Sequence, residues 1–219
     1  MKLRMLIISL CGLVAMGRSA AALELGERAP MADVKMKNAS AGKDEGGPTP
    51  RQSGYGHAGG QLSIADAKGP KGTLVIFSCN HCPFVKGWET RIAELGNTWR
   101  KNGVGVIAVN SNDPAAYAED GFTEMQQRAK QRGFEFPYVV DATSEVGRAF
   151  GATRTPEAFL FDKDGKLAYH GTIDDNYQDA SKVKDHYLRD ALEALVGGKE
   201  IPVRETKAIG CSIKFRAKS

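Results

Sequence analysis

The sequence has little cysteine, little excess charge and, after its first residues, no long apolar run. Four cysteines among 219 residues are far too few for a scaffold stapled by disulfides. The formal net charge is only +4, which argues against nucleic acid as the partner. No segment after the N-terminal region reaches the ~18 apolar residues of a membrane span. These absences leave one globular domain whose chemistry has to be found in short motifs.

The N-terminal residues predict a leader that is cleaved during export. Lys2 and Arg4 form a basic region, an apolar stretch covers residues 5–17, and Ala20 and Ala22 fit the small-x-small pattern of a cleavage site. We therefore expect a signal peptide at residues 1–22, with an uncleaved anchor as the alternative. The mature protein would be periplasmic or secreted and would not insert stably into a membrane.

Cleavage of the leader changes the net charge and the number of cysteines of the protein. The leader carries three basic and no acidic residues, so the charge of residues 23–219 falls from +4 to about +1. The remaining cysteines are Cys79, Cys82 and Cys211. In an exported protein, one close pair and one leftover thiol indicate redox chemistry rather than stapling.

The pattern of apolar residues predicts an α/β domain with a central mixed β-sheet flanked by helices. A Gly- and Pro-rich loop covers residues 39–60. Strands are expected at 31–38, 61–64, 73–78, 104–110 and 136–141, helices at 82–102, 122–131, 144–151 and 183–195, and a hairpin at 156–171. The first long helix connects two buried strands, which should therefore be parallel.

Cys79 and Cys82 stand where a buried strand gives way to a helix. The unpaired N–H groups and the dipole of a helix start favour a thiolate, which is the nucleophilic form of cysteine. We expect Cys79 to be the exposed attacking sulfur and Cys82 the buried resolving sulfur. His81, between them, would stabilise a Cys79 thiolate, or would be only a turn residue.

Two cysteines at this spacing could also form a structural zinc site or a structural disulfide, or be two unrelated core residues. A zinc site needs four ligands, and there is neither a second Cys-x-x-Cys nor a cluster of histidines. A disulfide across a two-residue loop gains little closure entropy. No metal and no organic cofactor are therefore expected.

Five residues are candidates for the mouth of a substrate site: Asn80, Asn110, Gly171, Asp174 and Asp175. Asn110 ends the strand expected to run parallel to the one before Cys79, and ligands gather at the carboxyl ends of parallel strands. Gly171 ends the hairpin, where the lack of a Cβ would let a substrate backbone approach. Asp174 and Asp175 would either shape the mouth or start the last helix.

Several stretches resemble a known superfamily. "FSCNHCPFVK", "TPEAFLFD" and "DDNY" are similar to thioredoxin-like proteins, and "LELGERAP", "GVIAVNSND" and "IGCSIKF" more narrowly resemble the peroxiredoxin-like branch of the AhpC/TSA-type redoxins that carries a Cys-x-x-Cys. The resemblance covers nearly all of the mature chain. It implies a thioredoxin-like fold with a cis-proline facing the redox pair. Pro156, with Thr155 before it, matches that proline and would hold the substrate chain.

Around Cys79 and Cys82, the sequence differs from the proteins that it resembles. Asn80-His81 replaces the Gly-Pro of thioredoxins, and the preceding strand lacks their acidic residue. The histidine is similar to the one in the periplasmic oxidase DsbA. Cys82-Pro83 matches the peroxidatic Cys-Pro of peroxiredoxins, but Cys79 stands where those proteins carry threonine.

These observations predict an exported thiol–disulfide oxidoreductase that acts on protein thiols or disulfides, or on a redox partner protein. The alternatives are a thiol peroxidase that reduces hydroperoxides and a non-catalytic thioredoxin-like binding module. Cys211 is a candidate third redox cysteine, because the tail after Gly198 is long enough to return to the pair. The alternative for Cys211 is burial on the far side of the sheet.

Overall fold

The computed structural model describes residues 22–40 and 60–217. Nearly all of the predicted leader and most of the predicted 39–60 loop lie outside the described residues. Within those ranges, no helix has the length and apolar character that crossing a membrane requires.

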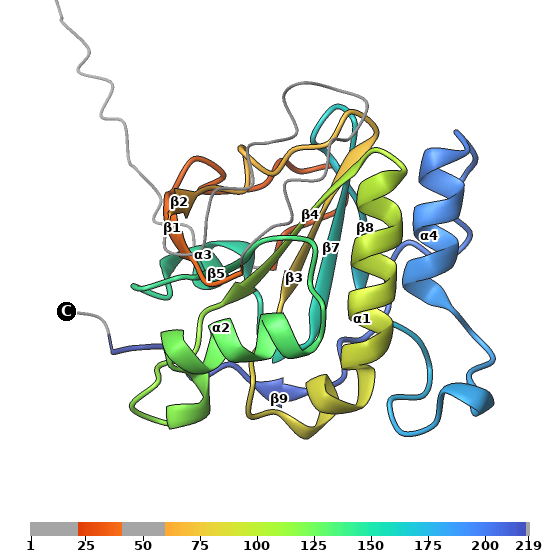
Figure 1. The fold of residues 1–219 in the computed structure, drawn as a ribbon. Coiled ribbons are helices and arrows are strands. Elements are labelled where there is room, and N and C mark those ends of the chain that lie inside the picture. The colour runs from red at the N-terminus through yellow and green to blue at the C-terminus, as the bar shows by residue number, and fades with distance from the viewer. Residues whose placement is uncertain (1–21, 41–59, 218–219) are drawn as a thin grey trace, which may run out of the picture.

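Seven strands form one mixed sheet, as the sequence predicts (Figure 1). They are β1 (Met36–Asn38), β2 (Gln61–Leu62), β3 (Gly72–Phe77), β4 (Val104–Asn110), β5 (Tyr138–Val140), β7 (Glu157–Asp162) and β8 (Leu167–Gly171), in the order β2-β1-β5-β4-β3-β7-β8. The central strand β3 pairs in parallel with β4 and antiparallel with β7. Every residue of β3 and β4 is buried, which explains why both read as continuous apolar runs.

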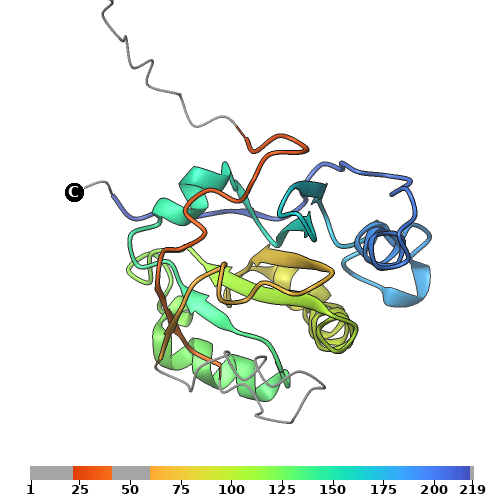
Figure 2. The same cartoon turned by 90° about the horizontal axis from the view of Figure 1, so that it is seen from above.

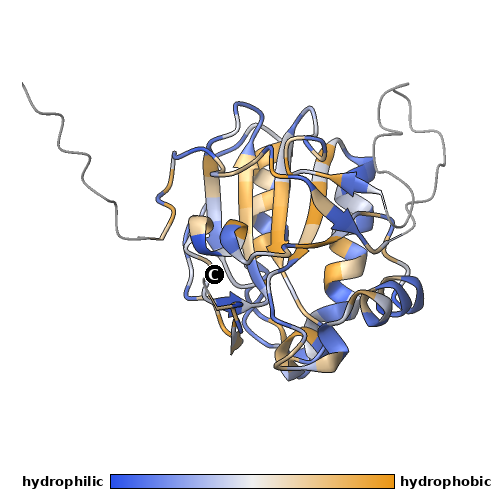
Figure 3. Cartoon of the chain, turned by 90° about the vertical axis from the view of Figure 1, so that its left-hand side faces the viewer, coloured by the Kyte–Doolittle hydropathy of each residue, from blue (hydrophilic) through white to orange (hydrophobic). Residues whose placement is uncertain are grey.

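Helices cover both faces of this sheet (Figure 2). The helices are α1 (Pro83–Lys101), α2 (Phe122–Gln131), α3 (Glu145–Phe150) and α4 (Tyr187–Val196), with short 3₁₀ turns η2 (Ala118–Asp120) and η3 (Ala180–Lys182). Leu74 and Ile76 of β3 belong to the core shared with α1, α2 and α4. Val75 and Phe77 belong to the opposite core, with α3. Figure 3 shows the apolar strands between the more polar helices.

The last helix begins later than the sequence predicts. The apolar pattern predicts a start at Val183, close to the end of the hairpin, but α4 starts at Tyr187. The chain between β8 and α4 instead crosses α1, where Asp174 accepts a hydrogen bond from the Trp88 indole at 2.6 Å and pairs with Arg91. This buried anchor fixes the start of the 172–186 segment against α1, and the segment contains only the short 3₁₀ turn η3 before α4.

A second, two-stranded sheet lies beside the main one. In it, β6 (Arg154–Thr155) pairs antiparallel with β9 (Cys211–Ser212). Figure 1 shows β9 next to the chain that enters α1. The fold therefore brings the C-terminal segment to the end of the sheet where β3 leads into Cys79.

Candidate active site

The start of α1 is centred on Cys82. Cys82 is the N-cap residue, Pro83 occupies the first turn, and the N–H of Lys86 donates to the Cys82 carbonyl at 3.0 Å. The first turn offers N–H groups that have no partner within the helix, and the Val85 N–H interacts with the Cys82 sulfur. The helix N-terminus thus faces the second cysteine rather than the first.

Thr155 contacts both sulfurs of the pair. Cys79 Sγ lies 3.1 Å from Thr155 Oγ1, and the Cys82 thiol donates to the Thr155 carbonyl oxygen at 3.1 Å. The Thr155–Pro156 peptide bond is cis, as the resemblance implies. Both cysteines are free thiols. The Thr155-Pro156 turn and the Cys-x-x-Cys therefore form one contact region.

The expectation that Cys79 is exposed is wrong. Cys79 is 1% exposed and Cys82 is 0% exposed. Both pack with Val85 in a small apolar cluster that Phe84 and Cys211 cover. The C-terminal segment provides part of this cover, and the local sequence around the pair gives no indication of it.

The two sulfurs have opposite tendencies to ionise. The hydrogen bond with Cys82, burial and the negative charge of Asp120 raise the pKa of Cys79. The hydrogen bond from Cys79, helped by Cys211 and the Val85 N–H, lowers the pKa of Cys82 to about 4 against the effect of burial. A thiolate is thus favoured at Cys82, between two thiols, which reverses the expected order of acidity.

Ionisation of Cys82 has one local cost. A thiol can donate to the Thr155 carbonyl, but a thiolate cannot, so this hydrogen bond exists only while Cys82 is protonated. The helix N-terminus and the Cys79 and Cys211 thiols supply donors to the ionised sulfur. These donors outweigh the one unfavourable carbonyl.

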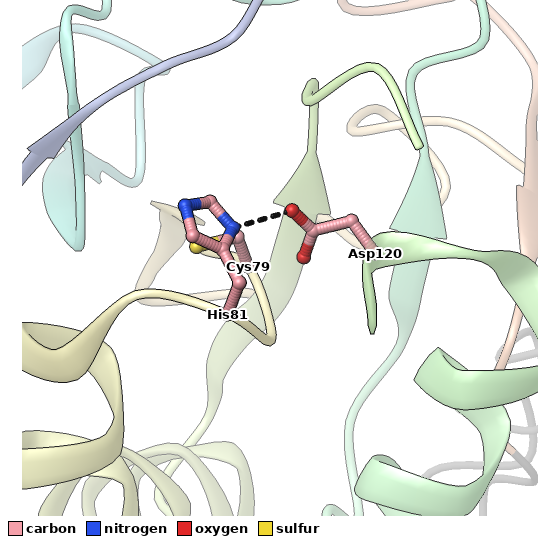
Figure 4. Close-up of side chains that lie close together, drawn as sticks. All are labelled: Cys79, His81 and Asp120. Carbon is pink, nitrogen blue, oxygen red and sulfur yellow. Dashed lines mark hydrogen bonds and ion pairs between the residues drawn. The ribbon is translucent and has the colours of Figure 1, made fainter. Parts of the chain in front are cut away.

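Asp120 is a buried carboxylate beside the pair, and the sequence pattern did not identify it. It is 3% exposed. The Asn80 N–H donates to it at 2.6 Å, the amide of Asn112 at 2.9 Å and the amide of Asn110 at 3.4 Å. His81 Nδ1 lies 2.6 Å from Asp120 Oδ2 (Figure 4). Asp120 thus connects the loop between the cysteines to the end of β4, because groups from both segments donate to its carboxylate.

Cys79, His81 and Asp120 form a thiol–imidazole–carboxylate cluster whose donor atoms lie within 4.8 Å of one another (Figure 4). The imidazole also stacks on Tyr117, with ring centroids 3.8 Å apart and an interplanar angle of 4°. An ionised carboxylate only accepts hydrogen bonds, so the Nδ1 that faces it carries a proton, and in the neutral imidazole Nε2 is then the acceptor. The Asp120 oxygens are already occupied by protein donors. The cluster therefore fits an oriented imidazole better than a metal site.

The structure places the other mouth candidates in supporting positions. Asn80 is buried, donates to the Glu119 carbonyl and accepts from the Tyr138 hydroxyl. Asn110 is buried against Asp120. Their amides hold the loops around the pair and do not face a substrate.

Gly171 does have a close backbone neighbour, but it belongs to the same chain. A Cβ on Gly171 would lie 2.0 Å from Thr206 Oγ1 and 2.6 Å from the Thr206 carbonyl. The C-terminal segment thus occupies the space that the sequence pattern suggests for a substrate. Asp174 binds α1 as described above, and Asp175 accepts from the Lys184 N–H. Neither aspartate begins a helix.

Glu157 is a second buried carboxylate that sequence reasoning missed. It follows Pro156 and accepts from the N–H groups of Thr153 and Arg154, both at 2.8 Å. Its other oxygen lies 2.7 Å from His170 Nε2. An acidic residue inside the apolar run "PEAFLF" was the available signal. Glu157 fixes the turn that carries Thr155.

Cys211 lies at the redox pair and not on the far side of the sheet. It is opposite Thr155 in the β6–β9 register, packs against the cluster of Cys79 and Cys82, and shares a hydrogen bond with Cys82. Burial and this contact raise the pKa of Cys211 to about 11, although Lys214 and Arg154 act in the opposite direction.

Comparison with known proteins identifies relatives of this chain. The AhpC/TSA family matches residues 28–170. The thiol-disulfide oxidoreductase ResA of Geobacillus thermodenitrificans is 30% identical over 109 residues, which cover 50% of this chain and 58% of that protein. The match thus spans little more than half the length of the curated relative.

Solved structures match more of the chain. An uncharacterised conserved protein from Geobacillus kaustophilus has 33% identity and a TM-score of 0.75, with 90% of this chain and 95% of that one covered. The peroxidoxin BcpB of Mycobacterium tuberculosis has 14% identity and a TM-score of 0.52, with coverage of 80% and 97%. The second likeness concerns the fold alone, which is thioredoxin-like as the sequence predicts.

We predict that Asp120→Asn lowers the pKa of Cys79, because it removes a negative charge that disfavours a second one nearby. A like charge at this range shifts a pKa by roughly one unit, so alkylation of Cys79 below its pKa should become ~10-fold faster. The rate would be measured with iodoacetamide in a Cys82→Ser/Cys211→Ser background, where Cys79 reacts alone. Glu119→Gln, at an exposed neighbour, is the control. An unchanged rate in a folded Asp120→Asn protein would contradict the assignment.

Proposed function

Because the chain belongs to the AhpC/TSA family, we propose that it is an exported thiol–disulfide oxidoreductase that works through Cys79 and Cys82. The observation that carries the proposal is the contact of both sulfurs with Thr155, beside Pro156, at the start of α1. A binding module without chemistry would have no need of two adjacent sulfurs with opposite tendencies to ionise.

The charge distribution favours Cys82 for the first step. In the reductive direction, the Cys82 thiolate attacks a disulfide, one sulfur of that disulfide leaves as a thiolate, and a mixed disulfide remains on Cys82. Cys79 then attacks Cys82 Sγ, the second substrate sulfur leaves, and the Cys79–Cys82 disulfide forms. The oxidative direction is the reverse. Cys82 is thus the entry point of the pair, and Cys79 the resolving sulfur, opposite to the sequence-based assignment.

His81 and Asp120 serve the second step. Cys79 must lose its proton before it attacks, and burial beside Asp120 opposes this loss. The carboxylate holds the Nδ1–H of His81, so that Nε2 can accept the proton of Cys79. His81 therefore activates the resolving sulfur, as the oriented bases of other thiol and hydroxyl nucleophiles do.

A mixed-disulfide trap tests which sulfur receives the substrate. The two variants Cys79→Ser/Cys211→Ser and Cys82→Ser/Cys211→Ser each keep one sulfur of the pair. With oxidised glutathione at pH 6, the variant that keeps Cys82 should accumulate at least ~10-fold more adduct, because its thiol is the more acidic. Intact mass and peptide mapping would measure this. More adduct on Cys79 would restore the sequence-based assignment, and no adduct on either variant or on the unmodified chain would refute the function.

Thiol peroxidase activity is a second candidate function. It is favoured because Cys82 is acidic, is followed by Pro83 and lies at the start of a helix. The sequence opposes it, since Cys79 stands where peroxidatic sites carry threonine. We predict that dithiothreitol exchanges with the oxidised pair much faster than micromolar hydrogen peroxide oxidises the reduced one. Stopped-flow fluorescence and dimedone labelling would compare them. Rapid formation of a Cys82 sulfenic acid would instead establish a peroxidase.

Export rests on the leader sequence, and protein thiols or disulfides are the proposed substrates. We predict that the full chain expressed in a Gram-negative host is recovered from the periplasm with Leu23 at its N-terminus. Intact mass of the periplasmic protein would show this. Retention of residues 1–22 on a membrane-bound product would show an uncleaved anchor instead.

A further inference from the structure

The C-terminal strand β9 is seated on the Thr155-Pro156 turn as an added strand. Cys211 lies opposite Thr155 and Ser212 opposite Arg154, and the Ile213 N–H donates to the Thr153 carbonyl at 3.0 Å. Extended peptides commonly bind proteins by adding a strand to an exposed edge in this way. Here the chain itself fills the edge and presents a cysteine to the redox pair.

The segment around β9 is fixed in place on both sides of Cys211. A Cβ on Gly210 would lie 2.1 Å from the Thr155 carbonyl, so only glycine allows the two backbones to approach this closely. Further along, the Lys214 N–H donates to Asn112 at 2.7 Å, and the Arg216 N–H donates to Ser144 at 3.0 Å. The position of Cys211 is thus set by the fold and not by chance contact.

Cys82 has a sulfur neighbour on each side. Cys79 belongs to the same small apolar cluster, Cys211 packs against that cluster, and both thiols lie close enough to stabilise a negative charge on Cys82. The structure thereby offers Cys82 two disulfide partners. Among the three cysteines of the described ranges, only Cys211 is partly accessible, since Cys79 and Cys82 are 1% and 0% exposed.

We propose that Cys211 carries disulfides between external thiols and the buried pair, with Cys82 bonded alternately to Cys79 and to Cys211. This proposal rests on the proposed function and deepens it, because it places Cys211 between the external molecule and Cys82, which remains the sulfur through which the pair is entered. Arg154 and Lys214 lie close enough to Cys211 to favour its thiolate. Their charge helps Cys211 to act as a nucleophile despite its partial burial.

The transfer conserves electrons. The Cys211 thiolate attacks Cys82 Sγ of the Cys79–Cys82 disulfide. The Cys82–Cys211 bond forms, the Cys79–Cys82 bond breaks, and the electron pair leaves on Cys79, which takes up the proton released by Cys211. An external dithiol then attacks Cys211 Sγ, and Cys82 leaves as its stabilised thiolate. The second thiol of that molecule attacks the external sulfur of the mixed disulfide, that sulfur's bond to Cys211 breaks, and Cys211 leaves as a thiolate. The external dithiol is thereby oxidised and the protein disulfide reduced.

The first test asks whether the second disulfide exists. Cys79→Ser, oxidised in a glutathione redox buffer, should form an intramolecular Cys82–Cys211 disulfide that peptide mapping identifies. The matched variant Cys82→Ser should form no Cys79–Cys211 disulfide under the same conditions. Absence of the Cys82–Cys211 linkage in folded Cys79→Ser would overturn the proposal. A Cys79–Cys211 linkage of equal yield in Cys82→Ser would also overturn it, because Cys82 would then not be central.

The second test asks whether exchange passes through Cys211. In the unmodified reduced chain, a bulky maleimide should label Cys211 before Cys79 and Cys82. In Cys211→Ser, exchange of the Cys79–Cys82 disulfide with reduced glutathione should slow at least ~10-fold, because the external thiol loses the accessible sulfur. Ser212→Ala, on the same strand, is the control and should exchange at the rate of the unmodified chain.

The outcomes separate this proposal from the function on which it rests. If Cys211→Ser exchanges as fast as the unmodified chain, or faster, β9 only shields the pair and the relay is wrong, while the oxidoreductase function stands. If the unmodified chain forms no Cys79–Cys82 disulfide in any glutathione buffer, the function itself fails, and the relay fails with it.

Discussion

The N-terminus of α1 is the constraint on which the rest of the site depends. Strand β3 ends at Phe77, and the chain turns through the Cys-x-x-Cys into a helix whose cap is Cys82. The free N–H groups of the first turn stabilise a negative charge at that point. Once Cys82 carries this charge, its sulfur neighbours must stay protonated, because adjacent anions in a buried cluster repel one another strongly. The helix end, the hydrogen bonds that Cys79 and Cys211 give to Cys82, and the burial of those two thiols together set the order of acidity among the three sulfurs.

Asp120 gives the site its second fixed charge. The hydrogen bond with Cys82, burial and the neighbouring carboxylate together place Cys79 in a region that disfavours its ionisation. A sulfur in such a place is a poor first nucleophile. It is a suitable resolving sulfur, because it needs to ionise only when a base takes its proton. His81, which Asp120 and Tyr117 hold beside Cys79, is the proposed base. Asp120, which disfavours the ionisation of Cys79, therefore also orients the base proposed to remove the Cys79 proton.

Much of the fold could be predicted from the sequence, because the strands and helices that bury most apolar area carry a clear period. The bounds of β4 and α2 agree with their patterns, and the Thr155-Pro156 turn lies where the resemblance placed it. The errors concern contacts between segments far apart in the chain. Cys79 is covered and Gly171 is filled because residues 204–213 return across the hairpin and the pair. A segment without an apolar period gives no sign of where it docks.

The buried carboxylates show why the site was harder to predict than the fold. Asp120 lies in "YAEDGF", where it looks like one of two acidic turn residues, and only the fold decides that Glu119 is exposed and Asp120 buried.

The three sulfurs pose the same difficulty for prediction from the sequence. A Cys-x-x-Cys can be found by its spacing, but the third cysteine is 129 positions after Cys82 and joins the pair through a strand of two residues. Because β9 occupies the edge beside Pro156, an external partner in the proposed mechanism either displaces this strand or exchanges with Cys211. In that mechanism, the tail that carries the least regular pattern in the sequence controls access to the redox pair.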